Sequence, residues 1–150
     1  MDPAAWLRKR GYNPEGDPCT AIARKYNCTA MWEAASAGEL GVCRFLWEHG
    51  AAATIRTKNC WDSTPMLAAC LNGHLNVAKW LFETDAADDI RTKDDSDCTP
   101  MWAACGEGHL NVAKWLLEVG AAEDIRTEDE NGCTPMWAAC GEGHLNVAKW

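Results

Sequence analysis

The chain has 150 residues, of which 47% are hydrophobic and 24% charged, and its formal net charge is −8. This composition is typical of a soluble globular protein and argues against a disordered one. No apolar run approaches the roughly 20 residues that a membrane-spanning helix needs. Because an acidic surface repels phosphate, the net charge also argues against nucleic acid as a ligand.

Residues 1–28 differ in charge from the rest of the chain. They carry five basic and three acidic residues, whereas the remainder carries nine basic and nineteen acidic ones. We expect a short helix from Pro3 to Arg10, followed by a bend rich in Pro and Gly. A secretory signal places its basic residues before the apolar segment, and here they follow it. We therefore expect a cytoplasmic or at least intracellular protein. We also expect residues 1–28 to form an N-terminal capping segment.

From residue 29 onward the sequence repeats with a period of 35 residues. The repeats start at 29, 64, 99 and 134, and the segment TPMWAACGEGHLNVAKW occurs twice, at 99–115 and 134–150. One helix pair cannot bury its apolar face alone, but identical units bury it against one another. We expect residues 29–150 to form one elongated array whose fourth repeat is truncated and exposed, as part of a longer protein.

Each repeat predicts two short helices. A Thr that caps the first helix precedes a Pro at the first helical position, as in Thr99 and Pro100. Gly106 and Gly108 predict the end of this helix after about two turns. An apolar stripe then predicts a second helix over residues 110–119.

The segments between the helix pairs contain three further patterns. A positive φ is predicted at two sets of corresponding positions, because Gly, Asn and Asp tolerate it. The first set is Gly50, Asp85 and Gly120, and the second is Asn27, Asp62, Asp97 and Gly132. The alternating Ile-Arg-Thr segments predict short strands, followed by acidic turns. We also expect a ladder of weak surface ion pairs from Arg56, Arg91 and Arg126 to acids of the next repeat.

These motifs resemble the ankyrin repeat. Thr-Pro-Met-x-x-Ala, Gly-His-Leu, Val-Ala-Lys-x-Leu and Gly-Ala-Ala stand where that family has its conserved segments, across about residues 29–150. The family's His after Thr-Pro-Leu is replaced by Trp32, Leu67, Trp102 and Trp137, so we expect indole packing between repeats instead of that residue's hydrogen bonds. The resemblance implies an all-α fold, an α-solenoid of stacked helix-turn-helix repeats joined by extended β-turn finger loops.

The resemblance also implies a non-catalytic protein-interaction module or scaffold that binds partners through its finger loops and first helices. We expect a monomer and a protein partner with a basic or neutral surface, because the loop tips are acidic. The expected contact residues at the loop tips are Asn59, Cys60, Trp61, Asp94, Asp95, Ser96, Asp129, Glu130 and Asn131. On the first helices they are Leu71, Asn72, Gly106, Glu107, Gly141 and Glu142. Trp61 is either an interface anchor or an indole folded onto the next repeat.

Other functions find less support in the sequence. The sequence lacks the nucleophile, base and phosphate-binding motifs of an enzyme, and we expect no cofactor. The pairs Cys70/His74, Cys105/His109 and Cys140/His144 leave open a metal- or redox-responsive module. We expect no metal, since a Gly separates each pair and small buried thiols explain the cysteines. We expect Cys98 and Cys133 to be more exposed, which leaves open that they are oxidisable, although nearby acids should raise their pKa. A structural spacer within a larger protein is the remaining alternative.

Overall fold

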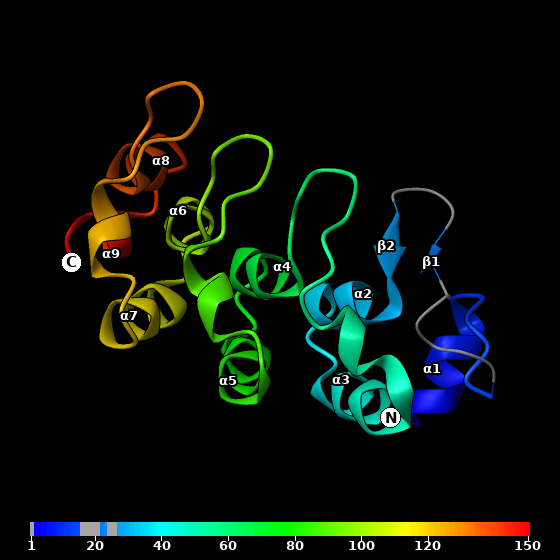
Figure 1. The fold of residues 1–150 in the computed structure, drawn as a ribbon. Coiled ribbons are helices and arrows are strands. Elements are labelled where there is room, and N and C mark those ends of the chain that lie inside the picture. The colour runs from blue at the N-terminus through cyan, green and yellow to red at the C-terminus, as the bar shows by residue number, and fades with distance from the viewer. Residues whose placement is uncertain (1, 16–21, 24–26) are drawn as a thin grey trace.

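The computed structural model describes residues 2–15, 22–23 and 27–150 and shows a stack of helix pairs (Figure 1). Helix α1 (Pro3–Lys9) comes first, and strands β1 (Ile22–Ala23) and β2 (Cys28–Thr29) pair antiparallel, with Ile22 opposite Thr29. The pairs are α2 (Ala30–Ser36) with α3 (Leu40–Leu46), α4 (Pro65–Leu71) with α5 (Leu75–Thr84), α6 (Pro100–Gly106) with α7 (Leu110–Glu118), and α8 (Pro135–Gly141) with α9 (Leu145–Ala148). The predicted all-α solenoid is confirmed.

The first helix of every repeat begins as the sequence predicts. The Thr hydroxyl oxygen accepts a hydrogen bond from the backbone N–H three residues later, at 3.1–3.3 Å, in all four repeats. Pro occupies the first helical position of α4, α6 and α8, where its missing N–H leaves no intrahelical bond unmade. Each first helix therefore starts at a fixed residue, and this keeps the repeats in register.

The core consists of the same repeat positions stacked on one another. The most deeply buried side chains, at 0 or 1% exposure, recur at intervals of 35 residues. They are Met31, Met66 and Met101 on the first helices, and Val42, Val77, Val112, Leu46, Leu81 and Leu116 on the second. Burying one such side chain contributes about 1.5–3 kcal/mol. Because each lies between neighbouring helices, the stability of the stack comes from interfaces between repeats.

Close packing between repeats depends on glycines that face a histidine. Gly73 has a φ of +75°, and a Cβ added there would lie 2.5 Å from Nδ1 of His109 in the next repeat. Gly38 meets His74 in the same way, and Nε2 of His74 lies 3.1 Å from the carbonyl oxygen of Ser36. A histidine in Gly-His-Leu therefore joins neighbouring repeats.

The predicted positive φ values are confirmed at one set of positions and at two of the three positions of the other. Asn27, Asp62, Asp97 and Gly132 have φ between 53° and 76°, and Gly50 and Gly120 have φ of 98° and 116°. The prediction for Asp85 is wrong, because its φ is −162°. The turn still forms, since the next N–H, that of Ala86, reaches the carbonyl of Leu81 at 3.0 Å.

The predicted Ile-Arg-Thr strands are also wrong. The corresponding segments are short 3₁₀ turns, η3 (Ala87–Arg91) and η4 (Ala122–Arg126), and the first repeat has irregular turns at η1 (Trp47–Ala51) and η2 (Ala52–Thr54). The turn buries both Asp89 and Ile90, at 2% and 7% exposure. A strand would direct these adjacent side chains to opposite faces, so only a helical turn lets both enter the stack.

The arginine ladder forms between neighbouring repeats at two of its three predicted positions. Nη2 of Arg56 lies 2.9 Å from Oδ1 of Asp89, and Nη2 of Arg91 lies 3.1 Å from Oδ1 of Asp124. The pairs are not the fully exposed ones expected, because the aspartate side chains are only 3% exposed. The hydrogen bonds that Arg56 donates to Asp89 raise the pKa of Arg56 above its ordinary value. Within the described ranges, Arg126 has no ion-pair partner.

The face formed by α8 and α9 is exposed, as the sequence predicts. Met136 and Trp137 are 48% and 62% exposed, whereas Met101, which corresponds to Met136, is fully buried. Leu145 and Trp150 are exposed as well. This face therefore lacks the covering that every internal repeat receives from its neighbour.

Candidate functional site

Three finger loops rise from one edge of the stack. We define them as residues 57–63, 92–98 and 127–133. Each is closed by the side chain at one position, which accepts hydrogen bonds from two backbone N–H groups of its own loop at 2.8–3.1 Å. The three closing residues are Asn59, Asp94 and Asp129. Their shared geometry gives the loops one backbone shape, because a local side chain replaces part of a backbone turn.

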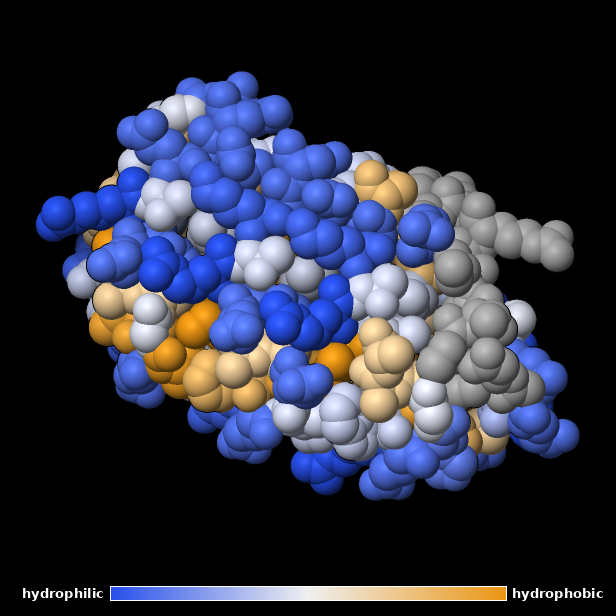
Figure 2. Space-filling model, in the orientation of Figure 1, coloured by the Kyte–Doolittle hydropathy of each residue, from blue (hydrophilic) through white to orange (hydrophobic). Residues whose placement is uncertain are grey.

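Backbone hydrogen bonds also join the loops to one another. The N–H of Asp95 donates to the carbonyl of Trp61 at 3.0 Å, and the N–H of Glu130 donates to the carbonyl of Ser96 at 2.9 Å. Figure 2 shows hydrophilic residues covering this edge of the molecule. The loops therefore present a continuous polar edge whose spacing is set by main-chain contacts.

The structure divides the predicted contact residues into exposed and structural ones. Ten are exposed, namely Cys60, Trp61, Leu71, Asn72, Asp95, Glu107, Glu130, Asn131, Gly141 and Glu142. Gly106 is buried, so the expectation that it contacts a partner is wrong. Ser96 is half-buried, like the loop-closing Asp94 and Asp129, and Asn59 is only 4% exposed. The amide of Asn72 bonds the hydroxyl of Ser36 at 3.3 Å, which joins two first helices. The loop-closing side chains thus shape the surface, and the exposed ones form it.

Six of the predicted contact residues come together in a groove of about 300 Å³ between the first two finger loops and helix α4. They are Asn59, Trp61, Leu71, Asp94, Asp95 and Ser96. We call this the Trp61 groove. Trp61 and Leu71 are 44% and 37% exposed. Nine predicted residues lie outside the groove: Cys60, Asn72, Gly106, Glu107, Asp129, Glu130, Asn131, Gly141 and Glu142.

Sequence reasoning missed three residues that line this groove, Trp32, Ser63 and Leu67. Trp32 is assigned to packing by its helical spacing, and its indole Nε1 does lie 3.4 Å from the hydroxyl of Ser63. A signal was present in the sequence, because Leu67 stands where the other repeats carry Trp. A smaller side chain at that position leaves room beside the first loop.

The tryptophans that replace the family's histidine do more than pack. Nε1 of Trp102 donates a hydrogen bond to the carbonyl of Cys133 at 2.9 Å, across the boundary between two repeats. The expectation of packing alone is therefore incomplete. An indole N–H can reach the neighbouring loop from this position and satisfy a carbonyl there.

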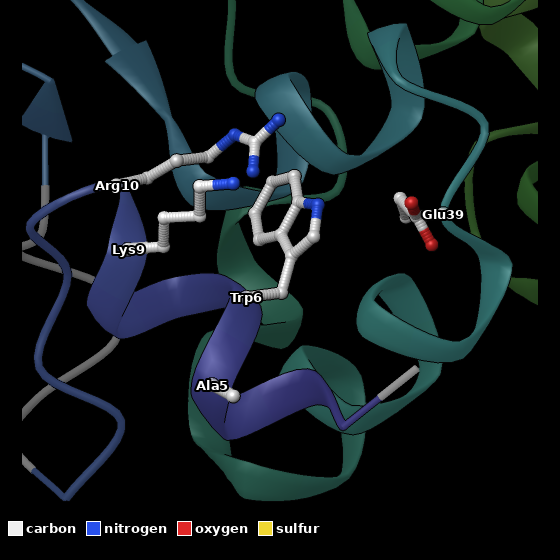
Figure 3. Close-up of a pocket in the computed structure, with 5 residues that line it drawn as sticks. All are labelled: Ala5, Trp6, Lys9, Arg10 and Glu39. Carbon is white, nitrogen blue, oxygen red and sulfur yellow. The ribbon is translucent and has the colours of Figure 1, made fainter.

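A second hollow lies beside α1 and is lined by Ala5, Trp6, Lys9, Arg10 and Glu39 (Figure 3). The guanidinium carbon of Arg10 lies 3.8 Å from the centre of the Trp6 ring, and Nε lies 3.7 Å from Glu33. The charge of Arg10 is thus already engaged within the chain. Trp6 and Leu7 are buried in the same core as the repeats, so this region serves to pack α1 on the first repeat.

Two of the three Cys/His pairs have structural surroundings. In the third, Cys140 is exposed, so the expectation of a buried thiol is wrong there. Cys70 and Cys105 are at most 2% exposed, and burial raises the pKa of the Cys105 thiol to about 11. Burial likewise raises the pKa of Cys70, while the paired His74 contacts Ser36 in the preceding repeat. Across the part of the chain that the structure describes, no three His, Cys, Asp or Glu side chains form a metal-binding group.

The two cysteines before the Thr caps have raised pKa values, in the direction predicted. Burial, and then the charges of Asp94 and Asp129, raise the pKa of Cys98 to about 12. Desolvation and Asp129 also raise the pKa of Cys133. Since the thiolate is the reactive form, neither thiol is activated for redox chemistry at neutral pH.

No helix of the described residues combines the length and apolarity needed to span a bilayer. No curated protein matches the chain significantly. The family described as ankyrin repeats (3 copies) matches residues 6–94 and 86–150. Ankyrin repeats generally mediate protein–protein interactions and are typically non-catalytic. The matched segments span nearly the whole chain, and the chain therefore belongs to the ankyrin repeat family.

Proposed function

We propose that this chain is a protein-recognition module, and that the finger loops together with the exposed ends of the first helices contact the partner. One observation carries the proposal: hydrogen bonds to the main chain fix the loops, while Asp95, Glu130 and Asn131 are exposed. A surface held in its binding shape loses little conformational entropy when a partner binds. The order imposed by the loop-closing residues is therefore suited to recognition.

The electrostatics of this surface favour a partner with basic or neutral character. The two lysines of the first loops are already paired, Lys58 with Asp62 at 3.2 Å and Lys93 with Asp97 at 3.3 Å. Among the described residues, the exposed carboxylates of Asp95 and Glu130 have no ion-pair partner. Opposite charges on a partner would steer association and fix its register.

We also propose that residues 1–28 cap an array formed by residues 29–150. The burial of Trp6 and Leu7 against the first repeat supports this division. A capped N-terminal face prevents head-to-tail stacking of copies on that face, and we expect a monomer, which sedimentation velocity would test. Buried thiols such as Cys43 and Cys70 fit a reducing, intracellular compartment.

Affinity capture with two charge-reversal variants tests the surface. The first variant carries Asp95→Lys, Glu107→Lys and Glu130→Lys, all exposed on the proposed surface. Asp94 and Asp129 are left intact because they close their loops. The matched control carries Glu48→Lys, Glu83→Lys and Glu118→Lys, which make the same charge change on or beside the second helices.

Partners held by the wild type and by the control, but lost by the first variant, are the expected result. Equal loss from both variants would mean that net charge alone governs capture. Equal retention by both would place the contact elsewhere and sink the surface assignment.

A further inference from the structure

The repeats differ from one another at many positions, and three of the differences meet in space. The repeat that starts at Thr64, together with the loop before it, carries three apolar residues where the following repeats have other types. These are Trp61, Leu67 and Leu71, which stand where the next repeats have Ser96 and Asn131, Trp102 and Trp137, and Gly106 and Gly141. All three line the Trp61 groove. Three of the departures from the repeat pattern thus lie at one surface.

The departures create a groove with an apolar floor and one exposed aromatic wall. Leu67, at 3% exposure, forms part of the floor beside Trp32, and Leu71 continues it toward the end of α4. Trp61 contributes an indole that is 44% exposed. A volume of about 300 Å³ lies at the lower end of ligand-binding cavities, so it suits one or two side chains rather than a cofactor.

Negative charge surrounds this floor. Asp94 and Asp95 line the groove, and the main chain of Asp95 is tied to Trp61 by the 3.0 Å hydrogen bond. This bond holds the backbones of Asp95 and Trp61 together, and both residues line the groove. The neighbouring Lys93 pairs with Asp97, and among the described residues the carboxylate of Asp95 has no ion-pair partner. The groove therefore combines an apolar surface, an aromatic face and an unpaired carboxylate.

These features select the chemistry of the occupant. An arginine fits an aromatic face beside a carboxylate better than lysine does, because its planar guanidinium stacks and pairs at the same time. The chain itself shows the arrangement at Arg10, which lies over Trp6 and beside Glu33. Acidic partners and nucleic acid are disfavoured by the same carboxylates.

We propose that the Trp61 groove binds a linear peptide segment of a protein partner, with an arginine over Trp61 and beside Asp95 and a neighbouring apolar side chain on Leu67 and Leu71. This inference rests on the proposed function, since it names the site within the recognition surface and the kind of partner that the site accepts. The partner is defined by a short motif of one basic and one apolar residue.

The chain offers its own matched variants for a test. Leu67→Trp installs the residue that three other repeats carry at this position, so it fills the groove with a side chain that the fold already accommodates. Asp95→Asn removes the charge without a change in size. Glu118→Gln makes the same change of charge on the second helix of another repeat and serves as the control. Circular dichroism and urea midpoints verify that all three fold.

The experiment pans a phage library of random linear peptides against the wild-type chain, with Leu67→Trp as the counter-selection. We expect enriched peptides to share an arginine next to an apolar residue. Synthetic versions of these peptides should bind the Leu67→Trp variant at least about tenfold more weakly than the wild type, because the indole fills the pocket at the centre of the contact. Asp95→Asn should weaken binding and flatten its salt dependence, whereas Glu118→Gln should leave both unchanged.

Failure of this inference is distinguishable from failure of the proposed function. Peptides that bind wild type and Leu67→Trp equally, but lose affinity for the Asp95, Glu107 and Glu130 charge-reversal variant, would overturn the groove and leave the surface assignment standing. Enriched peptides without a basic residue, or no peptide that prefers wild type to Leu67→Trp, would also overturn the groove. Peptides indifferent to every one of these variants would overturn both.

Discussion

Replacing Arg56 by Met should destabilise the chain by about 2 kcal/mol. The Arg56 side chain is 45% exposed and donates from Nε and Nη2 to Oδ1 of Asp89, which is only 3% exposed. Exposed pairs contribute about 0.2–1 kcal/mol, whereas breaking a buried pair costs about 3–5 kcal/mol. This pair lies between those limits. Met preserves the apolar stem, so the measured cost reports the lost charge and hydrogen bonds.

The cost arises from the aspartate that remains. Without Arg56, the described contacts of the Asp89 carboxylate reduce to the Thr92 hydroxyl at 3.3 Å, since Oδ2 is buried without a hydrogen-bond partner. Removing both partners should therefore cost less than removing the arginine alone. The double variant Arg56→Met with Asp89→Thr tests this, because Thr54 occupies the corresponding position in the first repeat.

Urea unfolding followed by far-ultraviolet circular dichroism measures these differences, with Arg126→Met as the control. Arg126 holds the corresponding position but has no ion-pair partner among the described residues, so its loss should change stability by no more than about 0.5 kcal/mol. Equal destabilisation by the two Met variants would refute the reasoning. A double variant less stable than Arg56→Met would refute the argument about the orphaned carboxylate.

Three further predictions concern a close contact between repeats, a hydrogen bond between repeats and a thiol beside the finger loops. Gly73→Ala should lower the free energy of unfolding by about 1–3 kcal/mol more than Gly143→Ala does. Both glycines have a positive φ, but only a Cβ at position 73 would meet a histidine, at 2.5 Å. Equal thermal midpoints for the two variants would contradict this. In chemical unfolding, Trp102→Phe should lower the free energy of unfolding by about 1 kcal/mol, because its hydrogen bond is lost. Trp137→Phe should lower it by less than half of that, since Trp137 is exposed. Alkylation of Cys98 by iodoacetamide, followed by mass spectrometry, should be slow at pH 8 and rise about tenfold per pH unit until its pKa near 12. Because this pKa exceeds the ordinary value of 9.0, the folded state holds the proton more tightly, and stability should fall as pH rises from 9 toward 12. A rate already at its plateau at pH 8 would contradict the raised pKa.

The repeat period and the helix starts could be predicted from the sequence because local chemistry decides them. Thr followed by Pro sets the start of a first helix whatever surrounds it, and Asn27, Asp62 and Asp97 take a positive φ because short polar side chains tolerate it. The apolar spacing on both helices likewise fixes which face must be buried. These features need only neighbours within a few residues.

Other features were decided only when the repeats stacked. Ile90 and its neighbours look like a strand in isolation, but burying Asp89 and Ile90 together required a 3₁₀ turn. The partial burial of the Arg56 ion pair depends on a residue 33 positions away, and no local pattern shows how deep that partner lies.

The candidate site divides in the same way. The sequence by itself determined which residues stand on the loops and first helices, and it marked Trp61 as a departure from the repeat. Only the tertiary structure placed Trp61, Leu67 and Leu71 around one groove and closed each loop on Asn59, Asp94 or Asp129. The physical reason is that periodicity specifies which surface each unit offers the next, whereas room for a ligand depends on side chains of two adjacent units meeting in space.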